Sequence, residues 1–263
     1  MFKKIVVLLM IFLPLTMLNH VASASSQLDL FDRKSDEALQ LAKLQRYEDS
    51  MGALEAFSVG ALQKMTSRAG FKVEEQEVAI SAYNQAIEAL EDSNADLADK
   101  VTALTKLRLV ADAIQTVRHP LWTEMEGQMM ATFEEAKRAV EEKDQNQFHS
   151  SLNKLLSQYD LIYDSMKLNL NAETMQGLDS KFQYINVIRP QLFKQGADQK
   201  ELDVLQYDMK QIFDKMKEDE ADPSLWWVIF TTGGIIISTL SYVGWRKYKG
   251  LKEKVKGKND LND

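Results

Sequence analysis

The sequence predicts an all-α protein, built as an antiparallel helical bundle or a short irregular helical-hairpin solenoid of about eight helices, plus one C-terminal transmembrane helix. Apolar residues recur every three or four positions through most of the chain, which is the period of a helix with one buried face. The 4 prolines and 11 glycines in 263 residues are too few for a many-stranded sandwich or barrel. No long segment alternates apolar and polar residues as a half-buried strand does.

Residues 1–24 have the three parts of a secretory signal peptide. Two lysines precede a short apolar run, and the small residues Ala22 and Ala24 suit cleavage after Ala24. The alternative is an uncleaved signal anchor. Pro14 ends the apolar run well short of the roughly 20 residues that a membrane span requires, which favours cleavage.

Residues 225–245 form a second apolar segment, which contains no charged residue. At a rise of about 1.5 Å per residue, a helix of this length crosses a hydrocarbon core of roughly 30 Å, so we expect a transmembrane helix. The alternative is a buried core helix, but such helices rarely lack charge over this length while carrying aromatic rings at both ends. These rings are the expected membrane-interface anchors: Trp226, Trp227, Tyr242, Trp245 and Tyr248.

The tail, residues 246–263, is basic, and positively charged flanks stay in the cytoplasm. Its expected stop-transfer residues are Arg246, Lys247, Lys249 and Lys252. Residues 25–224 then form the extracytoplasmic domain of a single-pass cell-membrane protein, with the lipid bilayer as one partner. The net charge of −7 combines the basic tail with an acidic domain whose 23 cations and 36 anions give −13. This acidity argues against nucleic-acid binding by the domain.

Four pairs of helices are predicted within residues 25–224, over 27–68, 73–118, 120–170 and 172–218, and the short connections predict antiparallel neighbours. Several residues mark the boundaries or breaks. They are Gly70, a cap among residues 92–94, the step from His119 to Pro120, a polar turn at 144–146, and a cap at Asn171.

The apolar stripes on these helices are clearest in the second half of the domain, from Trp122 to Val140 and from Phe148 to Leu170. A stripe from Met51 to Met65 predicts a helix nearer the N-terminus. Methionines such as Met129 and Met209 fall in register with large apolar residues, which favours core packing over an adaptable binding groove.

One stretch near the N-terminus is similar to a single tetratricopeptide unit, in which small and aromatic residues interlock two antiparallel helices. The residues that carry this similarity are Leu41, Ala42, Gln45, Arg46, Tyr47, Ala53 and Phe57. No second copy follows in register, so an irregular bundle or short solenoid is favoured over a true repeat array.

The sequence contains few residue patterns that are typical of a catalytic, cofactor or metal site. The chain has no cysteine, and after signal removal its histidines are His119 and His149, whose separation fits no local zinc motif. The carboxylates fall on polar helix faces, so we expect no enzyme, cofactor or metal site. The candidate partner-binding loop begins at Arg189 and Pro190 and includes Phe193, because a polar loop on a rigid scaffold suits recognition.

The chain as a whole resembles the bacterial sporulation protein YpjB family. The resemblance rests on the Lys-Lys signal peptide, the cysteine-free acidic helical domain, the Leu225-Trp226-Trp227 entry to one span and the lysine-rich tail. It includes the segments 44–47 and 182–190. It implies a sporulating Firmicute, a membrane-associated protein and a role connected with endospore formation, with no catalytic residue to transfer.

These expectations together describe a membrane-anchored, non-enzymatic interaction or scaffold protein that docks to another envelope or membrane protein. The alternative is a ligand-sensing ectodomain that signals through a partner membrane protein, since the tail is too short for an output domain. An enzyme acting on the cell wall is the third hypothesis.

Overall fold

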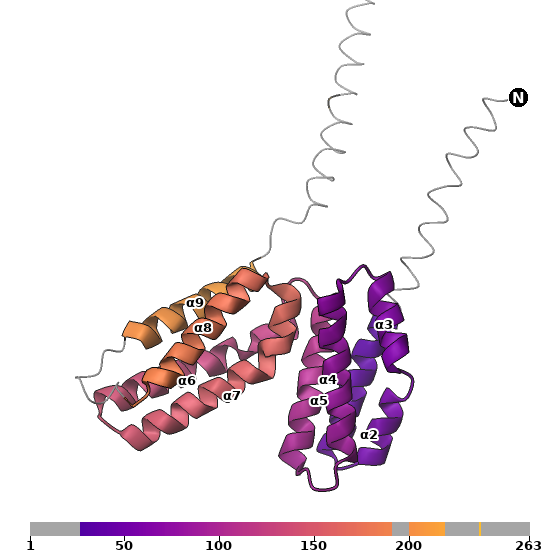
Figure 1. The fold of residues 1–263 in the computed structure, drawn as a ribbon, viewed down its shortest axis with the longest axis horizontal. Coiled ribbons are helices and arrows are strands. Elements are labelled where there is room, and N and C mark those ends of the chain that lie inside the picture. Colours follow the sequence, from indigo (N-terminus) through magenta and orange to yellow (C-terminus); the bar gives the residue numbers. More distant parts are fainter. Residues whose placement is uncertain (1–26, 191–199, 219–236, 238–263) are drawn as a thin grey trace, which may run out of the picture. The chain divides into compact units, whose positions relative to one another are not determined.

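The regular elements of the computed structural model are helices, which confirms the all-α prediction for the residues that the structure describes, 27–190, 200–218 and 237 (Figure 1). The first part of the chain contains a helix over residues 27–43, then α2 (Tyr47–Leu54), α3 (Val59–Arg68), α4 (Val73–Glu91) and α5 (Leu97–Gln115). The second part contains the 3-10 helix η1 (Leu121–Met125), then α6 (Glu126–Glu141), α7 (Gln145–Asn169), α8 (Ala172–Ile188) and α9 (Lys200–Lys217).

The helices before residue 116 form an N-terminal bundle around their own hydrophobic core. Its buried residues include Phe31, Leu54, Leu62, Leu104 and Leu107. Seven alanines complete the core, and their small side chains let neighbouring helices approach closely: Ala38, Ala42, Ala53, Ala79, Ala82, Ala86 and Ala111.

The helices from η1 to α9 form a C-terminal bundle around a second core of larger side chains. Trp122 and Phe213 are fully buried and pack together, with ring centroids 5.6 Å apart. The predicted stripes from Trp122 to Val140 and from Phe148 to Leu170 line this core, with Leu170 only partly buried, and Met129 and Met209 belong to it as well. Core packing of these two methionines is therefore confirmed.

The two bundles pack together along α5 and α7. Leu109 of α5 belongs to the C-terminal core, while Leu168 of α7 packs against the N-terminal core. Asn169 strengthens this joint, because its amide donates to the carbonyl oxygens of Ala113 and Thr116, and its side-chain oxygen accepts from the Trp122 indole at 2.9 Å.

Several predicted helix boundaries are confirmed. Gly70 follows α3 with a φ of +88°, a conformation that suits glycine, and the Asn171 side chain caps α8 by accepting from the backbone N–H of Thr174. The step from His119 to Pro120 separates α5 from η1, with His119 at a φ of 51°. Pro120 opens a short 3-10 helix, and α6 begins at Glu126.

Three boundaries are corrected. The stripe from Met51 to Met65 is divided between α2 and α3, because the Ser58 side chain caps a new helix by accepting from Ala61. Asp96 caps α5, whereas the carboxylate of Asp92 accepts from Asn94 in the turn before it. The polar turn lies earlier than 144–146, because Asp144 is already the N-cap of α7.

No helix among the described residues is long and apolar enough to span a bilayer. The predicted signal peptide, the span at 225–245 and the basic tail lie outside the described residues, except for Ile237. These three predictions are therefore not tested by the fold.

Candidate functional site

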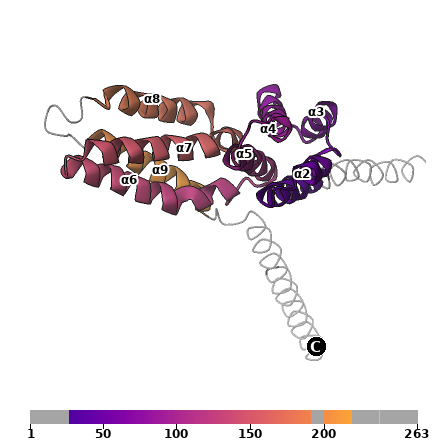
Figure 2. The ribbon, with the colours of Figure 1, turned by 90° about the horizontal axis from the view of Figure 1, so that it is seen from below.

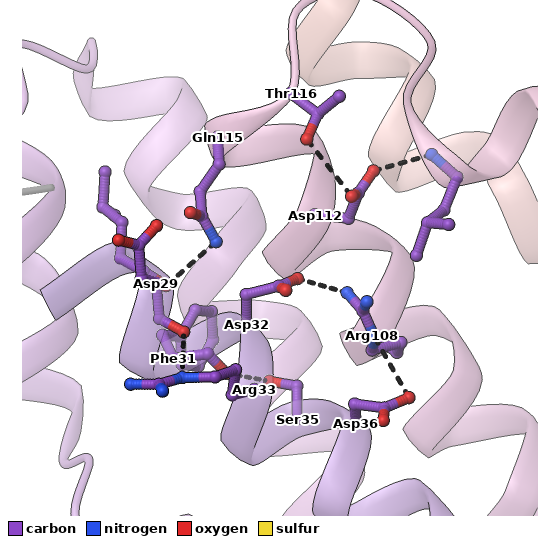
Figure 3. Close-up of polar contacts among 12 residues, drawn as sticks. Asp29, Phe31, Asp32, Arg33, Ser35, Asp36, Arg108, Asp112, Gln115 and Thr116 are labelled. Carbon is purple, nitrogen blue, oxygen red and sulfur yellow. Dashed lines mark hydrogen bonds and ion pairs between the residues drawn. The ribbon is translucent and has the colours of Figure 1, made fainter. Parts of the chain in front are cut away.

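Charged side chains gather where the helix of residues 27–43 faces α5 (Figure 3). Arg108 of α5 forms ion pairs with Asp32 and Asp36, which are one helical turn apart on that helix. Asp36 accepts from the Arg108 Nε atom at 3.4 Å. Because a guanidinium presents several donors in a fixed plane, one arginine can hold two carboxylates at once.

Further along α5, Asp112 lies one turn and Gln115 two turns beyond Arg108, and both hold neighbouring segments (Figure 3). The Asp112 carboxylate accepts from the backbone N–H of Leu121 at 2.6 Å and from the Thr116 hydroxyl at 3.2 Å. Gln115 donates to the carbonyl oxygen of Leu28 at 3.0 Å. We call the set Asp32, Asp36, Arg108, Asp112 and Gln115 the polar clasp. The clasp fixes both the first helix and the start of η1 to α5.

A pocket of about 390 Å³ borders the clasp and is lined by Asp29, Asp32, Arg33 and Gln115. Burial raises the pKa of Asp32, with smaller upward contributions from the carboxylates of Asp112 and Asp36, while Arg108 opposes the shift. The pocket presents carboxyl, guanidinium and amide groups, which can hold a polar ligand by hydrogen bonds. Within the described ranges, no group of three or more histidine and carboxylate side chains is placed to bind a metal ion.

A second polar cluster holds the end of α9. The Glu126 carboxylate, at the start of α6, pairs with Lys217 at 2.7 Å and with Lys210 at 3.3 Å. The backbone N–H of His119 donates to the carbonyl oxygen of Met216 at 3.0 Å. Hydrogen bonding from Lys217 and Lys210 lowers the pKa of Glu126 despite the opposing effect of burial. The last described helix is thus fastened to the segment that joins the two bundles.

A third cluster connects α7 to α8. The hydroxyls of Tyr159 and Tyr163 both donate to the Asp179 carboxylate, at 2.7 and 3.1 Å. Tyr159 also stacks on Phe182, with ring centroids 4.0 Å apart. Burial, followed by the hydrogen bond to Asp179, raises the pKa of both tyrosines, so each stays protonated and can donate.

The candidate loop after α8 is described only at its start. Arg189 donates to the side-chain oxygens of Asn153 and Asn186, both at 3.0 Å, so part of its guanidinium ties α8 to α7. Pro190 is exposed, and Phe193 lies outside the described residues. The predicted membrane anchors and stop-transfer residues are outside them as well.

The polar clasp was not predicted from the sequence, because 76 residues separate Asp32 from Arg108. Its only local signal is spacing. Asp32 and Asp36 are four residues apart, as are Arg108 and Asp112, so each pair lies on one side of its helix. Nothing in this spacing distinguishes the two pairs from ordinary charges on a solvated face.

Comparison with known proteins gives one family. The model described as "Sporulation protein YpjB (SpoYpjB)" matches residues 28–257. An uncharacterized protein YpjB from Bacillus subtilis (strain 168) is 32% identical over 265 residues, which cover 97% of each chain. No solved structure matches this chain.

Proposed function

We propose, from the premise that this chain belongs to the sporulation protein YpjB family, that it is a single-pass membrane-anchored protein whose helical domain serves as a non-enzymatic interaction or scaffold module in endospore formation. Its partner is another envelope or membrane protein. The family membership supports the association with sporulation, which agrees with the resemblance seen in the sequence.

The membrane anchor is supported by residues 225–245, which carry no charge and are followed by a basic tail. The family match extends to residue 257 and so includes this segment. The predicted span begins eight residues after Lys217, where α9 ends in the contact with Glu126.

The interaction role is carried by one observation: the polar clusters inside the fold connect one helix to another. Arg108, Asp112, Asp179 and Glu126 each join side chains or backbone from separate elements. Such contacts stabilise a rigid domain, and a rigid scaffold commonly positions the loops that carry binding residues. A wall hydrolase would instead need a positioned acid and base at a substrate cleft.

Partner capture tests the interaction role. The full chain with an affinity tag is crosslinked in sporulating cells and, as a control, in vegetative cells. We expect one defined envelope protein, enriched under sporulating conditions and recovered reciprocally when that protein carries the tag. If no reproducible partner is recovered from sporulating cells, the scaffold proposal is contradicted.

Topology is tested separately with alkaline phosphatase, which is active outside the cytoplasm. Fusion after Asp222 should give an active enzyme, and fusion after Lys258 an inactive one. The reverse pattern would overturn the orientation, and activity at both positions would overturn the anchor.

A ligand sensor is the second candidate function, favoured by the pocket of about 390 Å³ beside the clasp. A ligand that binds the folded state raises its thermal stability. Screening polar metabolites against the full chain in detergent should find a stabilising compound whose effect is lost in Asp32→Asn. Matched screening of Asp160→Asn, an exposed carboxylate of α7, supplies the control.

A further inference from the structure

The pocket of about 390 Å³ beside the polar clasp lies between two helices that are far apart in the sequence. The helix of residues 27–43, coloured indigo, runs next to α5 (Figure 2), and Gln115 of α5 donates to the carbonyl oxygen of Leu28 across this contact. Four polar side chains line the pocket: Asp29, Asp32, Arg33 and Gln115. The hydrogen bond of Gln115 and the ion pair of Asp32 with Arg108 hold the two walls together.

The pocket contains hydrogen-bond acceptors that no described residue uses. The carboxylate of Asp29, an exposed residue, has no hydrogen bond or ion pair within the described part of the chain. Asp32 accepts from Arg108 through Oδ1, which leaves its second oxygen available. Gln115 donates through Nε2, so its side-chain oxygen is also left as an acceptor. Carboxylate and amide oxygens therefore border the same cavity.

Arg33 supplies the donor of the pocket. It follows Asp29 by four residues, a spacing that places both side chains on one side of the helix and commonly gives an ion pair. The two side chains do not pair here. The Arg33 Nε atom donates to the backbone oxygen of Asp29 at 3.4 Å, and the terminal nitrogens have no partner among the described residues. A cationic and an anionic group thus line one cavity without contacting each other.

The surroundings of Asp32 favour a positive charge at the acidic wall of the pocket. Burial is the largest cause of the raised pKa of Asp32, and the Arg108 guanidinium opposes it. The carboxylates of Asp112 and Asp36 raise the pKa further, because like charges disfavour ionisation. An added cation next to Asp32 would relieve this repulsion.

We propose that this pocket binds the zwitterionic group of an α-amino acid. The ammonium group of the ligand has three N–H donors, which meet the carboxylates of Asp29 and Asp32 and the side-chain oxygen of Gln115. The ligand carboxylate meets the terminal nitrogens of Arg33, because a guanidinium can hold a carboxylate through two parallel hydrogen bonds. The volume of about 390 Å³ is within the range of about 300–1,000 Å³ that is usual for small-molecule sites.

The lining of the pocket disfavours other common ligand classes. A phosphate or a dicarboxylate would bring its negative charge against two carboxylates, with Arg33 as the only cation in the described lining. An apolar ligand would find no apolar side chain among the described lining residues. A simple amine would satisfy the acceptors but would leave Arg33 without a partner, so the amine serves as the comparison in the test.

This inference rests on the second candidate function, that of a ligand sensor, and names the class of its ligand. The ligand would connect the first turns of the helix of residues 27–43 to the last turn of α5. That turn lies next to Asp112, which accepts from the backbone N–H of Leu121 at the start of η1. Occupancy of the pocket would therefore add to the contacts that the polar clasp makes at this place.

Thermal unfolding of the full chain in detergent tests the class of ligand. The common amino acids are added singly at pH 7, and the most stabilising one is compared with two derivatives. Its amide lacks the carboxylate, and its N-acetyl form lacks the ammonium group. We expect at least one amino acid to raise the unfolding temperature, and we expect calorimetric titration to give roughly tenfold weaker binding for each derivative.

Substitutions in the pocket assign the two ends of the ligand. Arg33→Gln should weaken binding of the amino acid roughly tenfold and leave binding of its amide unchanged, because the amide makes no contact with the guanidinium. Asp29→Asn should weaken binding of both compounds. Exposed residues outside the pocket provide the matched controls Arg68→Gln and Asp160→Asn, which should leave binding unchanged. Circular dichroism verifies that each variant folds.

The outcomes separate this inference from the functions proposed above. If no amino acid stabilises the chain, or if Arg33→Gln leaves binding of the amino acid unchanged, the inference is overturned. Equal binding of the amide would overturn it as well, since the pocket would then be a site for amines. Stabilisation through Asp32 by a polar metabolite of another class would overturn it but would support the sensor. Partner capture, which tests the scaffold proposal, is independent of all these results.

Discussion

The N-terminal and C-terminal bundles are both helical, but their cores are built from different side chains. Seven alanines lie in the N-terminal core, whereas the C-terminal core contains two. The C-terminal core is filled by aromatic residues and five methionines: Met129, Met166, Met175, Met209 and Met216. Close approach of helices therefore dominates the first bundle, and interlocking of large side chains dominates the second.

The buried polar contacts of the N-terminal bundle are mostly made to the backbone. Buried side chains there donate to backbone carbonyls: Ser50 to Ala38, Tyr83 to Phe57, and Lys100 to three residues at the end of α4. Ion pairs between helices occur in both bundles, with Arg108 to Asp32 in the first and Lys137 to Asp203 in the second. Because alanine-lined helices lie close together, the short side chain of Ser50 reaches the backbone of the neighbouring helix.

This comparison predicts that the stability of the C-terminal bundle is most sensitive to loss of side-chain volume from its core. Trp122→Ala removes a fully buried ring that packs on Phe213 and donates to Asn169, and should lower the free energy of unfolding by about 3–5 kcal/mol. Urea denaturation of the full chain in detergent measures the change.

Hydrogen exchange then shows where the effect of Trp122→Ala lies. Amide protection should fall mainly in α6, α7 and α9. Amide protection in the N-terminal helices α2 to α4 should change less. The loss of protection caused by Trp122→Phe should lie between none and that caused by Trp122→Ala. Equal loss of protection in both bundles would show that they unfold as one unit and would remove the distinction.

The N-terminal bundle should be most sensitive to loss of a buried donor. Lys100 is 5% exposed, and its ammonium donates to the carbonyl oxygens of Ala89, Leu90 and Asp92. Lys100→Met keeps most of the side-chain length but removes the charged donor from these carbonyls, one of which belongs to the buried residue Leu90, so we expect a loss of about 2–3 kcal/mol in urea denaturation. Lys64→Met, at an exposed position of α3, is the control and should have little effect. Similar stability of both variants would refute the role given to Lys100.

A single hydroxyl in the C-terminal bundle should matter less. Tyr159→Phe removes the donor at 2.7 Å from Asp179 but keeps the ring that stacks on Phe182, and the Tyr163 hydroxyl remains as a second donor. We expect a loss of about 1 kcal/mol, measured by urea denaturation. A loss as large as that of Trp122→Ala would mean that the α7–α8 contact depends on the hydrogen bond more than on ring packing.

The smallest expected effect is that of the ion pairs at Glu126, which are partly exposed. Glu126→Gln should cost under about 1 kcal/mol at pH 7. Because the pKa of Glu126 is lowered from its ordinary value of 4.5, its contribution is complete above pH 4.5 and is lost as the pH falls through the lowered pKa. The difference between wild type and variant should therefore shrink below pH 4.5 in urea titrations.

Asp32 in the N-terminal bundle is a control, because its contribution to stability should depend on pH in the opposite direction. Its raised pKa means that its contribution is present below the ordinary value of 3.8 and is lost as the pH rises through the raised pKa. Asp32→Asn should thus gain stability relative to wild type as the pH rises. The same trend with pH in both variants would contradict the opposite directions of these two shifts.

Helical periodicity was sufficient to predict the all-α class and much of both cores, because a residue that recurs every three or four positions must share a face with its neighbours. Trp122, Phe133, Phe148 and Met209 lie where their stripes predicted. The period could not reveal the break between α2 and α3, since Ser58 interrupts the backbone without disturbing the spacing of Met51 and Met65. Local spacing also could not pair Asp32 with Arg108, because that contact depends on how separate helices pack.

The sequence by itself determined the helical class, the acidic charge of the domain, the uncharged segment at 225–245 and the resemblance to the sporulation family, because each depends on composition or on order along the chain. Only the tertiary structure decided that the described helices form two cores joined along α5 and α7, that Glu126 holds the end of α9, and that Glu173 is the one charged residue among the exposed positions of α8. These features depend on which helices become neighbours, and that is set by the shape and volume of side chains that are far apart in the sequence.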